Sequence, residues 1–148
     1  MVAGGASRRS TARQQGKWFA LSLDDSSPDS FTLEAWVKTT TTQGGAILGF
    51  ANLSTGAPGN YDRMIYMANT GQIYFGAGAN KTINSTLPYN NGAWHMVDAT
   101  LSQGGMALYI DGTPVASNPA VTEAQVYDGY WRVGYDSLVP EAGDHTLE

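Results

Sequence analysis

The chain has 148 residues, enough for one domain with a single sizeable core. Eight Lys and Arg against thirteen Asp and Glu give a formal charge of −5, which excludes the basic surface that a nucleic acid requires. Cysteine is absent, which excludes a disulfide framework, a thiolate metal site and a cysteine nucleophile. No apolar run approaches the roughly 20 residues of a membrane span, and the N-terminus lacks the apolar segment of a signal peptide.

Residues 1–16 mix Gly, Ala, Ser, Arg and Gln without periodicity, and we expect a flexible tail there. Residues 17–136 alternate short apolar runs with turn clusters at a spacing of roughly 8 to 12 residues, which is typical of an all-β sandwich. The expected strands are 17–23, 31–39, 46–51, 63–68, 72–77, 81–87, 94–101, 106–110, 115–116 and 130–135. Residues 137–148 lack periodicity and are interpreted as a second tail, with a non-native end as one reading.

The clearest strand runs from Phe31 to Thr39. Its alternation predicts one apolar face and one polar face, the polar face consisting of Thr32, Glu34, Trp36 and Lys38. The first strand is expected to end at Leu23, followed by a loop that contains Asp24 and Asp25, because short polar side chains favour turns. Asp111-Gly112 predicts a tight hairpin.

Four ordered segments resemble the laminin-G-like family of the concanavalin A-like lectin and glucanase superfamily. They are FTLEAWVK (31–38), YDRMIYM with GQIYFG (61–67 and 71–76), GAWHMV (92–97) and MALYIDG (106–112). The resemblance covers roughly residues 17–136 and implies an antiparallel two-sheet jelly-roll sandwich. Members of the family carry a further strand after the one resembling Tyr130 to Gly134, and nothing after Tyr135 resembles it. Either the chain is truncated or the sandwich closes differently. If the strand is missing, an unpaired sheet edge is exposed, which would favour a homodimer or the addition of a strand from a partner.

Catalysis is not expected. A glycoside hydrolase needs two carboxylates facing each other across a cleft, but Glu34 is alone on its strand, Asp98 is isolated, and Glu123 lies in an expected loop. His95 is interpreted as a hydrogen-bonded structural residue. The alternative that remains is a domain related to glycoside hydrolases or lyases.

Calcium is the one cofactor that the sequence suggests. Hard oxygen ligands at sandwich rims suit this ion, and the resemblance implies that Asp24 and Asp25 lie where laminin-G-like domains often carry a metal-binding Asp. Turn formation is the alternative role of these two residues.

Aromatic residues near polar loops are the candidates for ligand binding, because the flat C–H faces of sugars stack on aromatic rings while polar groups bond the hydroxyls. These candidates fall in three clusters: Tyr61, Asp62 and Arg63; Tyr89 and Asn91; and Tyr127, Asp128 and Trp131. Trp36 and Trp94 are expected instead to pack in the core or on a sheet face.

The sequence therefore predicts a non-catalytic module that binds a carbohydrate or an extracellular protein, appended to a secreted bacterial enzyme or displayed on a cell surface. A purely structural domain that pairs through an open sheet edge is a further alternative.

Overall fold

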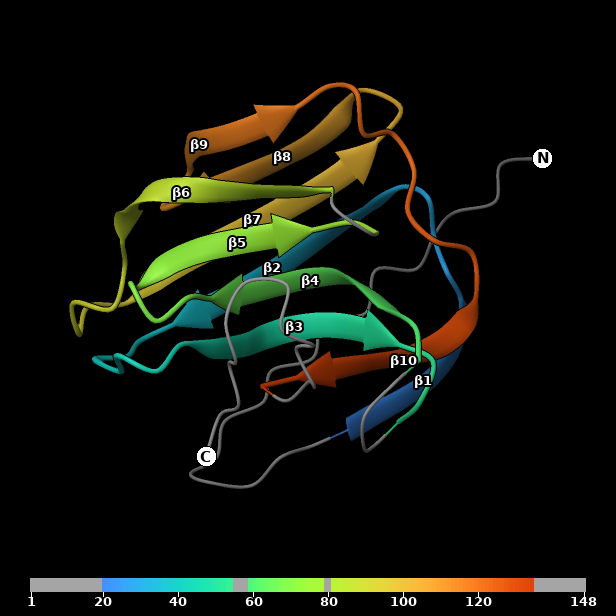
Figure 1. The fold of residues 1–148 in the computed structure, drawn as a ribbon, viewed down its shortest axis with the longest axis horizontal. Coiled ribbons are helices and arrows are strands. Elements are labelled where there is room, and N and C mark those ends of the chain that lie inside the picture. The colour runs from blue at the N-terminus through green and yellow to red at the C-terminus, as the bar shows by residue number, and fades with distance from the viewer. Residues whose placement is uncertain (1–19, 55–58, 79–80, 135–148) are drawn as a thin grey trace.

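The computed structural model describes residues 20–54, 59–78 and 81–134; for residues 20–26 it describes the backbone alone. These residues form ten strands and two antiparallel sheets, so the all-β sandwich predicted from turn spacing is confirmed (Figure 1). The strands are β1 Ala20–Ser26, β2 Phe31–Val37, β3 Gly45–Ala51, β4 Tyr61–Met67, β5 Gln72–Gly76, β6 Thr82–Pro88, β7 His95–Ser102, β8 Gly105–Ile110, β9 Thr113–Asn118 and β10 Asp128–Val133. None of the described segments forms a helix long and apolar enough to cross a membrane.

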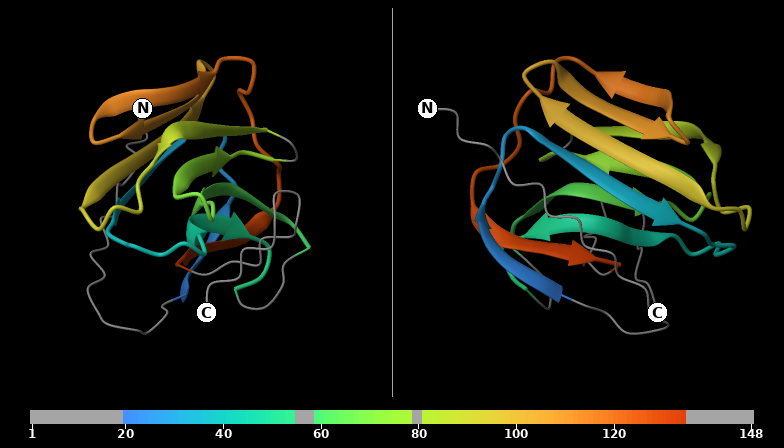
Figure 2. Two further views of the ribbon diagram at one scale, coloured as in Figure 1. Left: turned by 60° about the vertical axis from the view of Figure 1, so that its left-hand side comes forward. Right: turned by 180° about the vertical axis from the view of Figure 1, so that it is seen from behind.

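The two sheets differ in size. The larger one has the order β1-β10-β3-β4-β5-β6 and the smaller one the order β2-β7-β8-β9. Figure 2 shows the two layers face to face, with β2 and β7 behind the larger sheet in the view of Figure 1. Because β2 pairs only with β7 in the described chain, the FTLEAWV strand forms an edge of the smaller sheet.

The core lies between the sheets. In β7 every second side chain from His95 to Leu101 is buried, and the residues between them are partly open to solvent. This period of two gives the smaller sheet one buried face and one outer face. The inner residues include Leu33, Phe75, Val97, Leu101 and Leu108, which join a single apolar cluster.

The first strand extends further than the sequence predicts. β1 runs to Ser26, so Asp24 and Asp25 lie within a strand and not in a loop; Asp25 lies opposite Gly129 of β10. The predicted tails (1–16 and 137–148) and the segment after Tyr135 lie outside the described residues, so the missing closing strand stays a prediction. So does the homodimer, because no second copy is present.

Candidate functional site

Two exposed tryptophans mark one end of the smaller sheet. Trp36 near the end of β2 is 60% exposed, and Trp94 immediately before β7 is 61% exposed. Trp36 lies opposite Met96, and the alternation of β7 places Trp94 in the same outward series as Met96. The expectation was packing in the core or on a sheet face; neither tryptophan is buried in the core, and Trp36 lies on the outer face of the smaller sheet. We call the outer surface formed by Glu34, Trp36, Trp94, Met96 and Asp98 the β2–β7 face.

Two carboxylates lie opposite each other on this face. Glu34 of β2 is the register partner of Asp98 of β7. Partial burial raises the pKa of Asp98, and the nearby Glu34 carboxylate adds to the rise. Glu34 is the lone acid on its strand, as expected, but the expectation that Asp98 is isolated is wrong, because strand pairing places Glu34 beside it.

Loop contacts fix the backbone beside the tryptophans. The amide of Gly92 donates to the carbonyl of Thr39 at 3.0 Å, and Nδ2 of Asn90 donates to the carbonyl of Thr41 at 2.8 Å. These bonds tie the loop after β2 to the loop before β7, so the exposed Lys38 and Thr40 lie on a supported loop. The two indoles are thus held on ordered backbone at the same end of the β2–β7 ladder.

His95 supports the same region from inside. Its Nδ1 lies 2.8 Å from Oδ2 of Asp111, and its Nε2 lies 3.0 Å from Oδ1 of Asn91. The hydrogen bond from His95 and another from the amide of Met96 lower the pKa of Asp111. The ring of Tyr89 packs edge-on against His95, with centroids 5.0 Å apart. His95 is hydrogen-bonded, as expected, and it anchors the strand that carries Met96 and Asp98.

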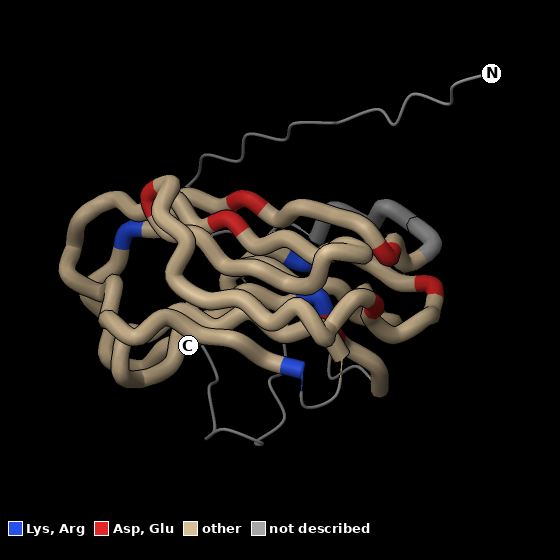
Figure 3. The backbone as a smooth tube through the Cα atoms, turned by 90° about the horizontal axis from the view of Figure 1, so that it is seen from above, with Lys and Arg blue, Asp and Glu red and all other residues tan. Residues whose placement is uncertain are grey.

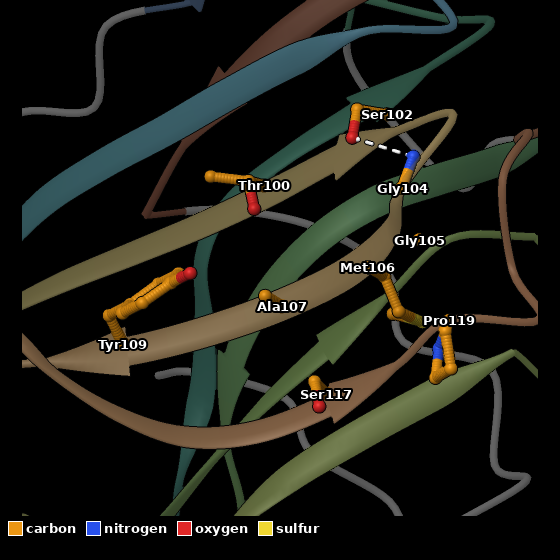
Figure 4. A pocket seen from close by; sticks show the side chains of 9 residues that line it. All are labelled: Thr100, Ser102, Gly104, Gly105, Met106, Ala107, Tyr109, Ser117 and Pro119. Atoms are coloured by element: carbon orange, nitrogen blue, oxygen red, sulfur yellow. Dashed lines mark hydrogen bonds between the residues drawn. The ribbon is translucent and has the colours of Figure 1, made fainter.

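A shallow hollow of about 270 Å³ extends the face toward the β7–β8 turn. It is lined by Thr100, Ser102, Gly104, Gly105, Met106, Ala107, Tyr109, Ser117 and Pro119. Figure 4 shows the hydroxyls of Thr100 and Ser117 rising from neighbouring strands on either side of Ala107, with the Tyr109 ring close by. Tyr109 is also the register partner of Asp98. From the tryptophans through the carboxylates to the hollow, the outer side of β7 therefore presents stacking surfaces, charges and hydroxyls in sequence.

Three residues from two of the predicted ligand clusters, Asp62, Arg63 and Tyr127, form an internal network instead. Asp62 is 3% exposed and Arg63 is fully buried, and their side chains pair with each other. The hydroxyl of Tyr127 lies 3.0 Å from Oδ1 of Asp62 and 2.9 Å from the carbonyl oxygen of Phe50. The interpretation of Asp62 and Arg63 as surface ligand groups is corrected, because these side chains satisfy one another inside the sandwich.

Electrostatics agree with an internal role. Burial raises the pKa of Asp62, while the Arg63 guanidinium and the hydrogen bonds to the carboxylate oppose that rise. Burial and the adjacent Asp62 raise the pKa of the Tyr127 phenol. Arg63 also donates to the carbonyls of Pro28 (3.1 Å) and Gln125 (2.9 Å), so it fastens two loops to β4.

The remaining predicted residues are scattered. Trp131 is half-buried and packs against Phe50 and Phe31, with centroids 5.0 and 6.3 Å away. Tyr61 is half-buried at the start of β4, and Asp128 is exposed at the start of β10. Of the predicted ligand residues, only Asn91 and Tyr89 lie at the tryptophan end of the smaller sheet. There Oδ1 of Asn91 accepts from the amide of Ala93 and lies 3.0 Å from Nε2 of His95.

A second aromatic pair lies on the larger sheet. Tyr66 and Tyr74 stack with centroids 5.0 Å apart. Burial and the neighbouring tyrosines raise the pKa of Tyr66 to about 12. Both rings are half-buried, so they offer less open surface than the two tryptophans.

No group of three or more His, Cys, Asp or Glu side chains gathers in the described ranges. The side chains of Asp24 and Asp25 are outside the description, so calcium binding by them stays a prediction.

One signal in the sequence could have indicated that Trp36 is exposed. The strand 31–39 places Trp36 on the same face as Glu34 and Lys38. Charged residues are almost never buried unpaired, so a ring between two of them belongs to an outer face. The pairing of Glu34 with Asp98 had no such signal, because strand register depends on tertiary structure.

Comparison with known proteins agrees with this architecture. A family model described as the concanavalin A-like lectin/glucanases superfamily matches residues 13–146. No curated protein sequence matches the chain.

Similar solved structures include the Ruminococcus gnavus sialidase module CBM40 bound to alpha2,6 sialyllactose (16% identity, TM-score 0.53, covering 70% of this chain and 64% of that one). Others are the mouse laminin alpha1 domains LG4-5 (15%, 0.51, 78% and 30%) and an endo-beta-1,4-glucuronan lyase from Trichoderma reesei (21%, 0.50, 71% and 55%). The chain thus spans 30 to 64% of the length of these proteins, and the identities show a shared fold alone. Through the match over residues 13–146, the chain belongs to the concanavalin A-like lectin/glucanases superfamily.

Proposed function

We propose that the domain is a non-catalytic glycan-binding module and that the β2–β7 face is its binding surface. The observation that carries the proposal is the pair of exposed indoles, Trp36 and Trp94, at one end of the β2–β7 ladder. Large aromatic rings left open on a sheet mark interaction surfaces. Flat indoles stack on the C–H faces of sugar rings, and the neighbouring carboxylates and hydroxyls can bond the sugar hydroxyls.

The fold and its relatives support this choice. The superfamily includes lectins, and the similar CBM40 structure holds a sialylated sugar. A sugar-binding role would fit an extracellular location, which we propose together with it. An extracellular protein is the alternative partner, and laminin domains are among the similar structures.

Glycan screening with tryptophan variants tests the proposal. We expect the purified chain to bind at least one class of oligosaccharide, and Trp36→Ala and Trp94→Ala each to weaken that binding about tenfold or more. Val126→Ala is the matched control, because Val126 is an exposed apolar residue (87%) on the loop before β10. Screening should be done with and without calcium, which also tests the expected metal. No binding across a broad glycan array, with or without calcium, would overturn the proposal.

A second function is favoured by one observation. Glu34 and Asp98 lie side by side on adjacent strands, and partial burial together with the nearby Glu34 carboxylate raises the pKa of Asp98. Glycoside hydrolysis uses two carboxyl groups, and the one that acts as the general acid has a raised pKa. Turnover of a polysaccharide that is abolished by Glu34→Gln, in a variant that still binds the polysaccharide, would replace the binding module with an enzyme.

A further inference from the structure

The charges of the β2–β7 face have no counter-ions among the described side chains. Neither Glu34 nor Asp98 forms an ion pair with any residue in the described ranges, where Asp62 pairs with Arg63 and Asp111 lies 2.8 Å from Nδ1 of His95. Two carboxylates directly opposite each other repel, so the strand pairing holds them together at a cost. A cation between or beside them would relieve that repulsion.

Few basic side chains are available on the surface to supply that cation. Of the four Lys and Arg in the described ranges, Arg63 and Arg132 are buried in internal hydrogen bonds, which leaves Lys38 and Lys81 nearer to solvent. Figure 3 shows acidic positions at several places along the described backbone and few basic ones. Lys38 follows Trp36 on the outer side, so it lies on the side of the indole away from Glu34. The carboxylates therefore face solvent without a cationic neighbour on their side.

The spacing links these charges to the stacking surface. Glu34 and Trp36 are two residues apart on one strand, a distance of about 7 Å along the chain, and both point outward. Opposite side chains in an antiparallel pair have Cβ atoms about 5 Å apart, so Asp98 lies within the same reach. A substituent on a sugar ring stacked on Trp36 could meet both carboxylates.

We propose that the β2–β7 face selects glycans that carry free ammonium groups, such as oligosaccharides of glucosamine, and disfavours carboxylated glycans. The inference rests on the proposed function, because the sugar ring is taken to stack on Trp36. Its direction comes from charge: an ammonium gains attraction from Glu34 and Asp98, an acetylated amine gains none, and a sugar carboxylate is repelled. The sialylated ligand of the CBM40 structure belongs to the disfavoured class.

Binding should be measured by calorimetry at a pH of about 6, where amines are protonated and exposed carboxylates are largely ionised. The probes are glucosamine oligomers, N-acetylglucosamine oligomers of the same length and glucuronic acid oligomers. We expect the glucosamine oligomer to bind about fivefold tighter than the acetylated one, the glucuronic acid oligomer to bind weakest, and the preference to shrink in high salt. Glu34→Gln with Asp98→Asn should reduce the preference to less than about twofold.

A charge-matched control separates this face from the general acidity of the chain. Asp29→Asn with Glu123→Gln removes two exposed acids outside the β2–β7 face, and it should leave the preference intact. The selectivity would be overturned by equal binding of the two amine-derived oligomers, or by a preference that survives Glu34→Gln with Asp98→Asn. The proposed function would still stand if Trp36→Ala weakened binding as expected. If no oligosaccharide binds, the proposed function fails as well, and the two failures are thereby distinguished.

Discussion

The guanidinium of Arg63 pairs with the carboxylate of its own sequence neighbour, Asp62, inside the sandwich. Adjacent side chains on a regular strand point to opposite faces, so this contact requires an irregularity. Asp62 and Ile65 of β4 lie opposite Phe50 and Leu48 of β3, so three steps along one strand match two along the other. Arg63, with φ of 50°, occupies this β-bulge, which brings both charged side chains into the interior.

Removing one member of this buried pair should destabilise the domain strongly. Asp62→Ala leaves the Arg63 guanidinium buried without its carboxylate, and we expect the free energy of unfolding to fall by about 3 to 5 kcal/mol. Tyr127→Phe removes only the phenol that bonds Asp62 and Phe50, and should cost about 1 to 2 kcal/mol. Urea unfolding measures both values.

A double variant is the control for the prediction on Asp62. Asp62→Ala combined with Arg63→Met removes both charges, and it should lower the free energy of unfolding less than Asp62→Ala alone. Arg63→Met should be measured alone as well. If the loss of unfolding free energy in the double variant equals the sum of the losses in Asp62→Ala and Arg63→Met, the two residues act independently, which would contradict the pairing.

Asp98→Asn should stabilise the domain at neutral pH. Burial and Glu34 raise the pKa of Asp98, so the folded state favours its protonated form. The stability that this carboxyl provides is fully present below its unfolded pKa and is lost as pH rises through the folded value. At pH 7 the Asn variant escapes that loss, and we expect a gain of about 0.2 to 1 kcal/mol. Unfolding measured at pH 7 and again near pH 3 should show the gain only at pH 7; an equal gain at both would contradict it.

Asp111 should give stability a pH dependence opposite to that of Asp98. Its pKa is lowered by the hydrogen bonds from His95 and from the amide of Met96. Its contribution is therefore present above the unfolded pKa, near 3.8, and is lost as pH falls through the lower folded value. Asp111→Asn tolerates the same left-handed backbone (φ 53°) and should flatten this loss in thermal unfolding below about pH 4. An unchanged acid limb in the variant would refute the assignment.

The parts of the fold that follow from local pattern could be predicted from the sequence. Alternation in Phe31 to Thr39 and the Asp111-Gly112 turn gave a strand and a hairpin that the structure contains. The candidate site followed less well, because only strand pairing brings Glu34 beside Asp98. The buried network could not be predicted either, because only tertiary packing joins Asp62 to Tyr127. The burial of Arg63 also depends on a bulge, which no period of two can indicate.

Truncation of an exposed tryptophan and of a packed one should change the free energy of unfolding by different amounts. Trp36→Ala removes a ring that is 60% exposed, so we expect a change in unfolding free energy within about 0.5 kcal/mol. Trp131→Ala removes a ring packed against Phe31 and Phe50, and should cost about 3 kcal/mol. Urea unfolding of both variants checks this. A strongly destabilised Trp36→Ala would mean that the ring is structural, and it would weaken the case for the β2–β7 face.

Two glycines in consecutive turns provide a matched test of backbone strain against backbone collision. Gly105 (φ 105°) and Gly112 (φ 75°) both adopt a conformation that disfavours a side chain. A Cβ at Gly112 would meet nothing within 4 Å, so Gly112→Ala should cost only the strain, about 1 to 2 kcal/mol. A Cβ at Gly105 would lie 2.5 Å from Cα of Pro119 and 2.7 Å from the carbonyl oxygen of Asn118, which cannot move without displacing the end of β9. Gly105→Ala should therefore cost clearly more in urea unfolding. It should also reshape the hollow beside the β2–β7 face, because Gly105 and Pro119 line that hollow. Equal costs for the two variants would show that the end of β9 yields freely, and that the hollow beside it is not a rigid surface.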